Sequence, residues 1–202
     1  MEYYHELITQ KSWEELQHLV KIADFVLIGG WAVYLYTRIL KSKDIDIIIE
    51  FGELPVLEKH YRLSKNERLK KYEAVKESVQ IDIYLPHYSN LGIPVEELIS
   101  RSRSVEGFKV LESNYLFALK IYTLAQRART PRGQKDFLDL VSLINSQKVE
   151  LTAVKKIIKE YQINKELLVF KDLLNENTDL PELNLNRHYF SKLKKEISSK
   201  LF

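Results

Sequence analysis

Two patterns of hydrophobic and polar positions divide the chain of 202 residues near residue 112. Before that point, short apolar runs of strand length alternate with stretches in which apolar residues recur at helical spacing. After it, the helical spacing continues to the end of the sequence. The fold class predicted is therefore α/β (α+β), with a small mixed sheet flanked by helices in residues 1–112 and an all-helical module in residues 113–202.

Three apolar runs of the first part, at residues 25–28, 44–50 and 79–85, have the length and composition of buried strands. Residues 108–111 form a weaker strand candidate, and residues 72–76 are expected to be an edge strand that follows a turn at 65–71. Helices are predicted at 12–23, 31–40, 55–61 and 94–100. Ser12 with Glu15 three residues later resembles a capping box, which places the start of the first helix at Ser12.

The second part reads as a series of helices at 113–129, 135–145, 152–161, 165–175 and 187–201. The Thr130-Pro131-Arg132-Gly133 segment is expected to separate the first two of them. In the last segment, apolar residues at helical spacing predict that the helix packs on the core, although its five basic residues could also contact RNA.

Composition excludes several classes of protein. The chain has no cysteine, which rules out disulfides, thiolate catalysis and zinc–thiolate sites and fits a reducing cytoplasm. It has no apolar stretch of about 18 residues, so no membrane span is expected. The start of the sequence is polar and acidic and does not resemble a signal peptide. A cytoplasmic location is therefore predicted.

The net charge is only +3, but it is unevenly distributed. Residues 101–135 contain eight basic side chains and two acidic ones. Such a stretch could bind a triphosphate or an RNA backbone, and a solvated helix face would show the same pattern. The eight are Arg101, Arg103, Lys109, Lys120, Arg127, Arg129, Arg132 and Lys135.

Three aspartates lie on the apolar strands, where carboxylates are rarely placed without a partner. Asp44 and Asp46 are two positions apart and share a strand face, and Asp82 lies within the run at 79–85. If the two strands pair, all three carboxylates gather on one surface, where they repel one another unless a cation lies between them. The pattern predicts a site for Mg²⁺ or Mn²⁺, which would bind substrate phosphates as well.

A glycine pair lies between the first strand and the next helix. Gly29 and Gly30 would let the backbone approach a phosphate, and the amides at the helix N-terminus would face the anion. Lys43, just before the aspartates, could reach a phosphate or lie in a solvated loop. A plain strand-to-helix turn with capping aspartates is the structural alternative.

These residues resemble the DNA polymerase β-like nucleotidyltransferase superfamily. Its signature is a strand, Gly-Gly or Gly-Ser, a helix, Asp-x-Asp and a third aspartate on a later strand; the match here is Gly29, Gly30, Asp44, Asp46 and Asp82. The resemblance implies a nucleoside triphosphate (NTP) substrate and a divalent metal held by the three aspartates, which form the catalytic set. The residue after the glycines is Trp instead of the frequent Ser, as in some small-molecule and antibiotic nucleotidyltransferases.

The second part resembles the abortive-infection nucleotidyltransferase toxins of type IV toxin–antitoxin systems, through residues 116–120, Ala125, Arg127 and residues 135–140. The resemblance implies that Lys120 binds the triphosphate and that Asp136, with Asp139 as the alternative, supports the site. Arg127 or Arg129 would help Lys120 to offset the phosphate charge. The resemblance also implies that the helical module closes the nucleotide cleft. A surface lysine and helix-capping aspartates would explain the same residues structurally.

The sequence thus predicts a metal-dependent nucleotidyltransferase that moves a nucleoside monophosphate from an NTP to an acceptor hydroxyl and releases pyrophosphate. The leading acceptor is RNA, for example a tRNA end, with a cognate antitoxin as partner. The alternatives are a small-molecule transferase and a catalytically inactive binding or antitoxin module.

Overall fold

The computed structural model describes residues 6–202, which divide into two compact units. One unit ends at Glu112 and contains the sheet, and the other comprises Ser113–Phe202 and is helical. Most of the polar start of the sequence, on which the prediction about a signal peptide rests, lies outside the described residues. No helix within residues 6–202 has the length and apolar character needed to cross a membrane.

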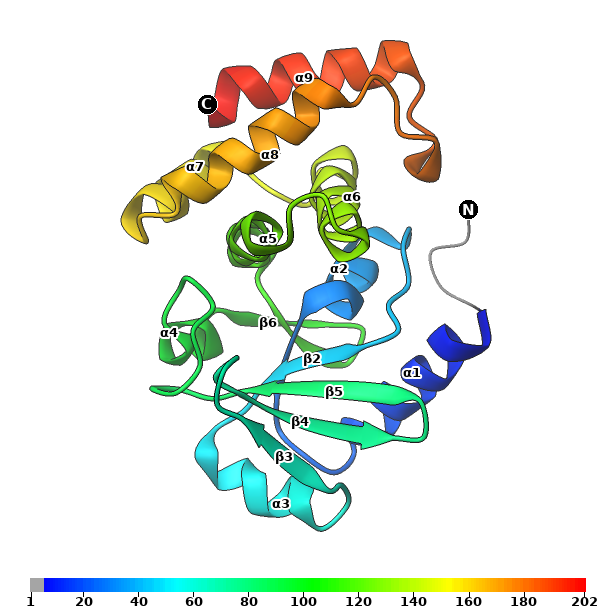
Figure 1. Ribbon diagram of the computed structural model, residues 1–202, viewed down its shortest axis with the longest axis vertical. Helices are drawn as coiled ribbons and strands as arrows, with labels where there is room; N and C mark the ends of the chain where they lie inside the picture. The colour runs from blue at the N-terminus through cyan, green and yellow to red at the C-terminus, as the bar shows by residue number, and fades with distance from the viewer. Residues whose placement is uncertain (1–5) are drawn as a thin grey trace. The chain divides into compact units, whose positions relative to one another are not determined.

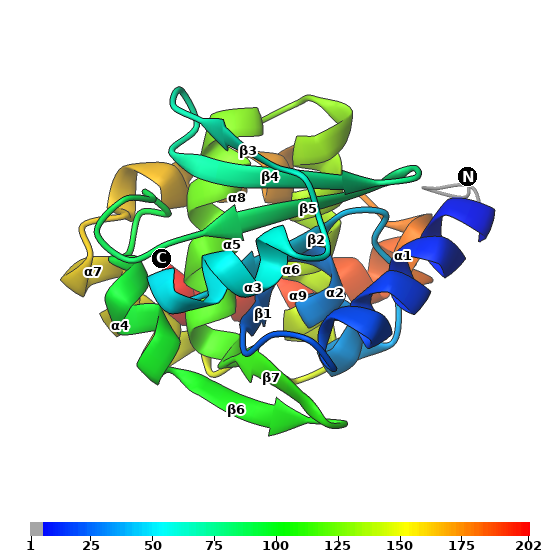
Figure 2. The ribbon, with the colours of Figure 1, turned by 90° about the horizontal axis from the view of Figure 1, so that it is seen from below.

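The first unit is built on a mixed sheet of seven strands in the order β3-β4-β5-β2-β1-β7-β6, which can be followed from top to bottom of Figure 2. The central strands β1, β2 and β5 consist mostly of buried branched residues, as expected for strands covered on both faces. The strands are β1 Val26–Ile28, β2 Ile45–Ile48, β3 Leu63–Asn66, β4 Lys71–Lys76, β5 Val79–Tyr84, β6 Ser102–Val105 and β7 Phe108–Leu111.

Within residues 6–112, helix α1 Glu6–Leu19 precedes the first strand, and α2 Gly29–Thr37, α3 Leu54–Glu58 and α4 Val95–Ser100 lie between strands (Figure 1). A short 3₁₀ helix, η1 Phe51–Glu53, leads into α3. Helix α2 follows β1 without a loop. It is apolar along most of its length, and six of its nine residues are buried. A sheet flanked by helices, followed by a helical unit, confirms the predicted fold class.

The start of the first helix was predicted wrongly. Helix α1 extends N-terminally past Ser12 to Glu6, so Ser12 lies in its middle and is fully buried. Its Oγ accepts a hydrogen bond of 2.8 Å from Nε1 of Trp31 on α2. The hydroxyl therefore satisfies a buried indole and joins two helices, whereas the sequence pattern suggested a helix cap.

The strand boundaries between residues 61 and 111 also differ from the prediction. The predicted turn at 65–71 is confirmed at residues 67–70, but residues 65 and 66 belong to β3 and Lys71 begins β4. Strand β4 is an interior strand because β3 pairs with it on one side and β5 on the other. Strand β6 was not predicted, because only Val105 in its sequence is apolar.

The helical unit contains α5 Ser113–Arg127, α6 Pro131–Asn145, α7 Leu151–Glu160, α8 Asn164–Glu176, η2 Pro181–Leu183 and α9 Arg187–Leu201. Phe117, Phe137 and Phe170 are fully buried in its core, with ring centroids of neighbouring pairs 5.8 and 5.9 Å apart. Helix α9 packs on the rest of the unit through Phe190, Ile197 and Leu201, as its spacing predicted.

Helix α6 begins four residues before the predicted start. Thr130 is its N-cap, and the Thr130 hydroxyl accepts a hydrogen bond from the amide of Gly133. Pro131 occupies the first turn, where its missing N–H costs nothing. A side-chain carbon at Gly133 would lie 2.7 Å from the carbonyl carbon of Ala128, so only glycine allows the chain to pass this closely. The two helices are separated as predicted, between Arg127 and Pro131, but residues 131–133 already belong to α6.

Candidate active site

The turn between β1 and α2 brings a glycine directly against an aspartate. Gly29 has a backbone φ of +68°, a left-handed conformation that residues other than glycine rarely adopt. A carbon added at this position would overlap Oδ2 of Asp46 and lie 2.6 Å from its Cγ. Gly29 and Asp46 are therefore in contact in the structure, and Gly30 follows in the first turn of α2.

The pairing of the strands brings two of the predicted carboxylates side by side. Strands β2 and β5 are parallel neighbours, and Asp46 is the register partner of Asp82. Register partners point to the same face of a sheet. Both carboxylates therefore lie on the same face, and Asp46 contacts Gly29 there. The strand pairing on which the sequence argument depended is confirmed.

Asp44 and Lys43 lie just before β2, in the segment that leads into the site. The Ser42 hydroxyl donates a hydrogen bond of 3.1 Å to the carbonyl oxygen of Asp44, which fixes the backbone there. That the side chains of Asp44 and Asp46 share one face stays a prediction.

The donors at this site fit a hard divalent cation. Asp44 and Asp46 supply carboxylate oxygens, which Mg²⁺ and Mn²⁺ prefer. Within residues 6–202, no three His, Asp or Glu side chains are grouped closely enough to hold an ion by themselves. A magnesium site with one or two carboxylates completed by substrate phosphates does not need such a group.

Asp82 has two partners that the sequence did not single out. Its Oδ2 lies 2.6 Å from Nζ of Lys71, and its Oδ1 accepts a hydrogen bond of 2.7 Å from Nε2 of Gln80. Lys71 also lies 2.9 Å from Oε1 of Glu73. The sequence did contain a signal for these contacts. Polar residues occupy alternate positions on two successive strands and so share one face of the sheet: Lys71, Glu73, Gln80 and Asp82. The metal-binding role of Asp82 stays a prediction.

In the helical unit, the predicted nucleotide-binding lysine is part of a buried ionic cluster. Nζ of Lys120 on α5 lies 2.7 Å from Asp136 and 2.8 Å from Asp139, both on α6. Lys135 binds the second oxygen of Asp139 at 2.5 Å, and Arg127 approaches Asp136 at 3.3 Å. The structure therefore joins Lys120, Arg127 and Asp136, which the sequence had grouped, and adds Lys135.

Burial and charge act in opposite directions on the two lysines of this cluster. Burial lowers the pKa of the Lys120 ammonium, but the charges of Asp136 and Asp139 outweigh it and raise the pKa above its ordinary value. Burial also lowers the pKa of Lys135, and its single carboxylate partner Asp139 does not compensate. Lys120 is thus held firmly as a cation between two carboxylates.

Trp31, which stands where the superfamily that the sequence resembles often has serine, is a core residue of the first unit. It is 1% exposed, hydrogen-bonded to Ser12 and packed against Trp13 at a centroid distance of 5.0 Å. A cavity of about 280 Å³ lies beside these two rings, with Tyr34 and Arg38 in its lining. Arg38 stacks over Tyr34 and forms an ion pair with Glu106.

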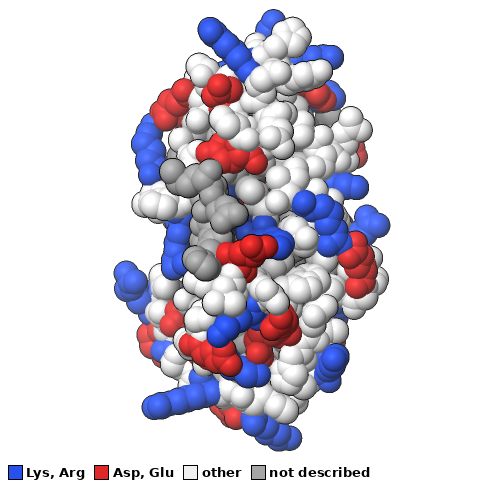
Figure 3. Space-filling model, turned by 90° about the vertical axis from the view of Figure 1, so that its right-hand side faces the viewer, with Lys and Arg blue, Asp and Glu red and all other residues white. Residues whose placement is uncertain are grey.

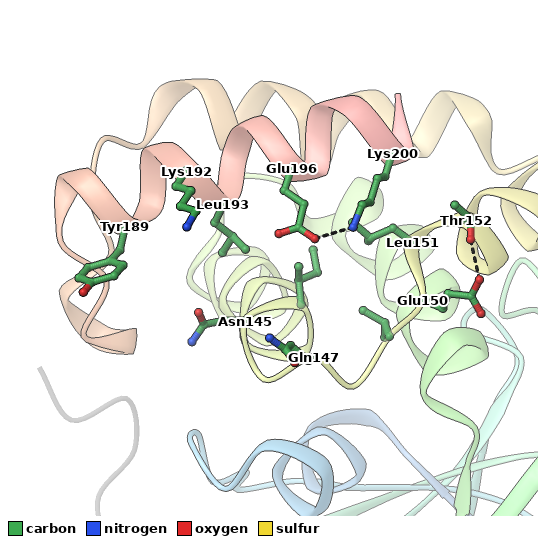
Figure 4. Close-up of a pocket in the computed structure, with 12 residues that line it drawn as sticks. Asn145, Gln147, Glu150, Leu151, Thr152, Tyr189, Lys192, Leu193, Glu196 and Lys200 are labelled. Carbon is green, nitrogen blue, oxygen red and sulfur yellow. Dashed lines mark hydrogen bonds and ion pairs between the residues drawn. The ribbon is translucent and has the colours of Figure 1, made fainter.

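A second cavity, of about 550 Å³, lies within the helical unit and is shown in Figure 4. Tyr189, Lys192 and Glu196 of α9 face it from one side, and Gln147 and Glu150 lie on the other. None of the residues that the sequence predicted for catalysis or nucleotide binding lines this cavity.

The basic stretch at 101–135 does not form one free cationic surface. Lys120 and Lys135 are buried in the ionic cluster, and Lys109 and Arg129 form ion pairs with Asp24 and Glu176. On the face shown in Figure 3, basic and acidic side chains are interspersed. The uneven charge of the sequence is therefore largely balanced by partners from elsewhere in the chain.

Solved structures identify the fold. A candidate nucleotidyltransferase from H. pylori matches 97% of this chain over 98% of its own, with a TM-score of 0.53 and 15% identity. The Megavirus polyadenylate synthase matches 70% of this chain with a TM-score of 0.50 and 14% identity. The chain has a nucleotidyltransferase fold. It spans 32% of the length of the viral enzyme.

No protein-family model and no curated protein matches the sequence. Neither of the two structures of the same fold is named as a toxin, so the resemblance to the toxin family stays a prediction. In both structures the identity is low enough that the similarity extends to the fold alone. The activity of this chain must therefore be argued from its own residues.

Proposed function

We propose that the chain is a metal-dependent nucleotidyltransferase that transfers a nucleoside monophosphate from an NTP to an acceptor hydroxyl. One observation carries the proposal: Asp46 lies between the left-handed Gly29 turn and the carboxylate of Asp82, on a nucleotidyltransferase fold. This arrangement combines oxygen donors for a cation with backbone amides for a phosphate, which are the two requirements of the reaction.

In this proposal, some residues of the first unit bind the triphosphate and the metal, and another acts on the acceptor hydroxyl. Amides of Gly29 and Gly30, at the start of α2, bind the triphosphate, and no side chain caps this helix end. Asp44 and Asp46 would hold Mg²⁺ or Mn²⁺, which would neutralise phosphate charge when bound. Asp82 accepts the proton of the acceptor hydroxyl.

The resemblance to the toxins supports a role for cations of the helical unit in binding the phosphates. Arg127 is more accessible than Lys120, because its side chain is 39% exposed, compared with 7% for Lys120. Asp136 contacts both cations and orients them. Lys43 remains a further candidate for phosphate binding, on the segment that leads to Asp44.

The proposed acceptor is RNA, and a cognate antitoxin is the proposed partner. The resemblance of residues 116–140 to the abortive-infection toxins supports both. A structure of the same fold is named as a polyadenylate synthase, and polyadenylate is an RNA. The balanced charge of the basic stretch favours the second candidate, a small-molecule acceptor.

Labelled nucleotides test the acceptor directly. The protein is incubated with each α-phosphate-labelled NTP, Mg²⁺ or Mn²⁺ and total cellular RNA, beside Asp46→Asn as a control. We expect label on an RNA band with the wild type and none with the variant. Label that appears only on a small molecule overturns the RNA acceptor, and no label on any acceptor contradicts the proposed activity.

A further inference from the structure

Three neighbouring strands carry one carboxylate each at the same level of the sheet. Asp46 on β2 is in register with Asp82 on β5, and Asp82 is in register with Glu73 on β4. Residues in register on adjacent strands point to the same face, with Cβ atoms about 5 Å apart. Such a row of like charges is unfavourable unless a cation lies within it.

Lys71 supplies a cation to this row from within the chain. It lies two residues before Glu73 on β4 and is therefore on the same face. Its Nζ is 2.6 Å from Oδ2 of Asp82 and 2.9 Å from Oε1 of Glu73. The residue is 6% exposed, and Nδ2 of Asn66 donates a second hydrogen bond of 3.0 Å to the same oxygen of Glu73.

Both carboxylate oxygens of Asp82 are engaged by the protein itself. Oδ2 pairs with the Lys71 ammonium, and Oδ1 accepts from the Gln80 amide at 2.7 Å. A carboxylate with these partners offers a divalent ion little net charge, and the buried ammonium repels a second cation placed beside it. Asp44 precedes β2 and Asp46 is the second residue of that strand, which pairs with β5 next to Asp82.

We propose that Lys71 takes the place of a second divalent ion, which would otherwise lie beside Asp82 on the side of the acceptor hydroxyl, so that the site uses a single divalent ion, at Asp44 and Asp46. This inference rests on the proposed function. Lys71 is a positioning residue: it holds Asp82 in place as the proton acceptor and keeps a second ion out. On this inference Asp82 accepts the proton without binding the metal, which differs from the role that the sequence predicts for it.

Counting bound ions tests this inference without reference to turnover. Mn²⁺ binding is measured by electron paramagnetic resonance, with a non-hydrolysable NTP analogue present. We expect one ion per chain in the wild type and two in Lys71→Met, where Asp46, Asp82 and Glu73 lose their internal cation. Lys76→Met, at the far end of the same strand, is the matched control and should bind one.

Two ions in the wild type, or one in a folded Lys71→Met, overturns the inference while leaving the proposed function intact. A wild type that binds no Mn²⁺ overturns both. If Lys71→Met does not fold, Asp82→Asn decides, because Asn keeps the shape of Asp82 and leaves Lys71 paired with Glu73. We expect its Mn²⁺ affinity to stay within about twofold of the wild type; a tenfold loss would show that Asp82 is a metal ligand.

Discussion

The contact between Gly29 and Asp46 defines the candidate site at the scale of single residues. A backbone in the left-handed region costs a residue with a Cβ about 1–2 kcal/mol, and here the added carbon would also overlap the Asp46 carboxylate. The glycine is therefore required twice, once for its conformation and once for the space it leaves to its neighbour.

Gly29→Ala should lower the free energy of unfolding by at least about 1 kcal/mol and displace the Asp46 carboxylate. Urea unfolding measures the first effect, and Mn²⁺ affinity measures the second. Gly52→Ala is the control, because nothing lies within 4 Å of a carbon added there. If Gly29→Ala proved as stable as Gly52→Ala, the turn would be shown to tolerate a side chain.

Asp46→Asn should abolish nucleotidyl transfer and leave the fold intact, because it removes the charge that holds the metal but keeps the shape of the side chain. The loss in rate should be at least about a hundredfold, since even residues that only orient metal ligands cost ten- to a hundredfold. Initial rates and circular dichroism measure the two effects. A variant that retains near-normal rates would remove Asp46 from the metal site.

Lys120→Met should destabilise the helical unit by about 3–5 kcal/mol, because it leaves two buried carboxylates without their shared cation. Arg127→Met is the comparison, with an expected cost of about 1 kcal/mol or less, since its pair with Asp136 is partly exposed. Chemical unfolding measures both. A fully stable Lys120→Met with weakened NTP binding would assign Lys120 to the nucleotide and not to the core.

At the scale of elements, Glu15 connects α1 to the sheet. Burial alone would raise the pKa of Glu15, but hydrogen bonds from Tyr61 and from Lys76 on β4 outweigh it and hold the pKa below its ordinary value of 4.5. The Tyr61 hydroxyl donates at 2.5 Å, and Nζ of Lys76 lies 3.0 Å away. The ionised carboxylate is therefore favoured in the folded state.

A depressed pKa in the folded state stabilises the protein above pH 4.5, and this contribution disappears as the pH falls through the folded value. Glu15→Gln should therefore be about 1 kcal/mol less stable than the wild type at pH 7 and nearly equal to it in strong acid. Urea unfolding across this range measures the difference. Glu14→Gln, one residue away and exposed, should show no such trend; a difference for Glu15→Gln that does not change with pH would contradict the linkage.

The elements that carry strong periodicity could be predicted from the sequence, and those that depend on tertiary partners could not. The runs around Ile47 and Ile81 were predicted correctly as buried strands, because consecutive β-branched apolar residues favour a strand that is covered on both faces. Ser12 was misread, since a buried indole from α2 satisfies it, and no local pattern shows this. Strand β6 was missed because Val105 is its only apolar residue.

At the scale of the whole molecule, the chain consists of a mixed sheet unit and a helical unit, each with its own buried core. The spacing of Gly29, Asp46 and Asp82 along the sequence was enough to predict their grouping, because strand pairing follows from the apolar runs. The partners of the charged residues were not predictable in the same way. Lys71 was assigned to a turn, yet it lies buried between two carboxylates contributed by different strands.

Release of pyrophosphate is the measurement that tests the central claim most directly. The wild type and Asp46→Asn, purified in parallel, are incubated with Mg²⁺, total RNA and each ribonucleoside triphosphate in turn. Our account predicts pyrophosphate release by the wild type that depends on the acceptor and on Mg²⁺, and none by the variant. Equal release by the two proteins, or none with any triphosphate and acceptor, would contradict nucleotidyl transfer at this site.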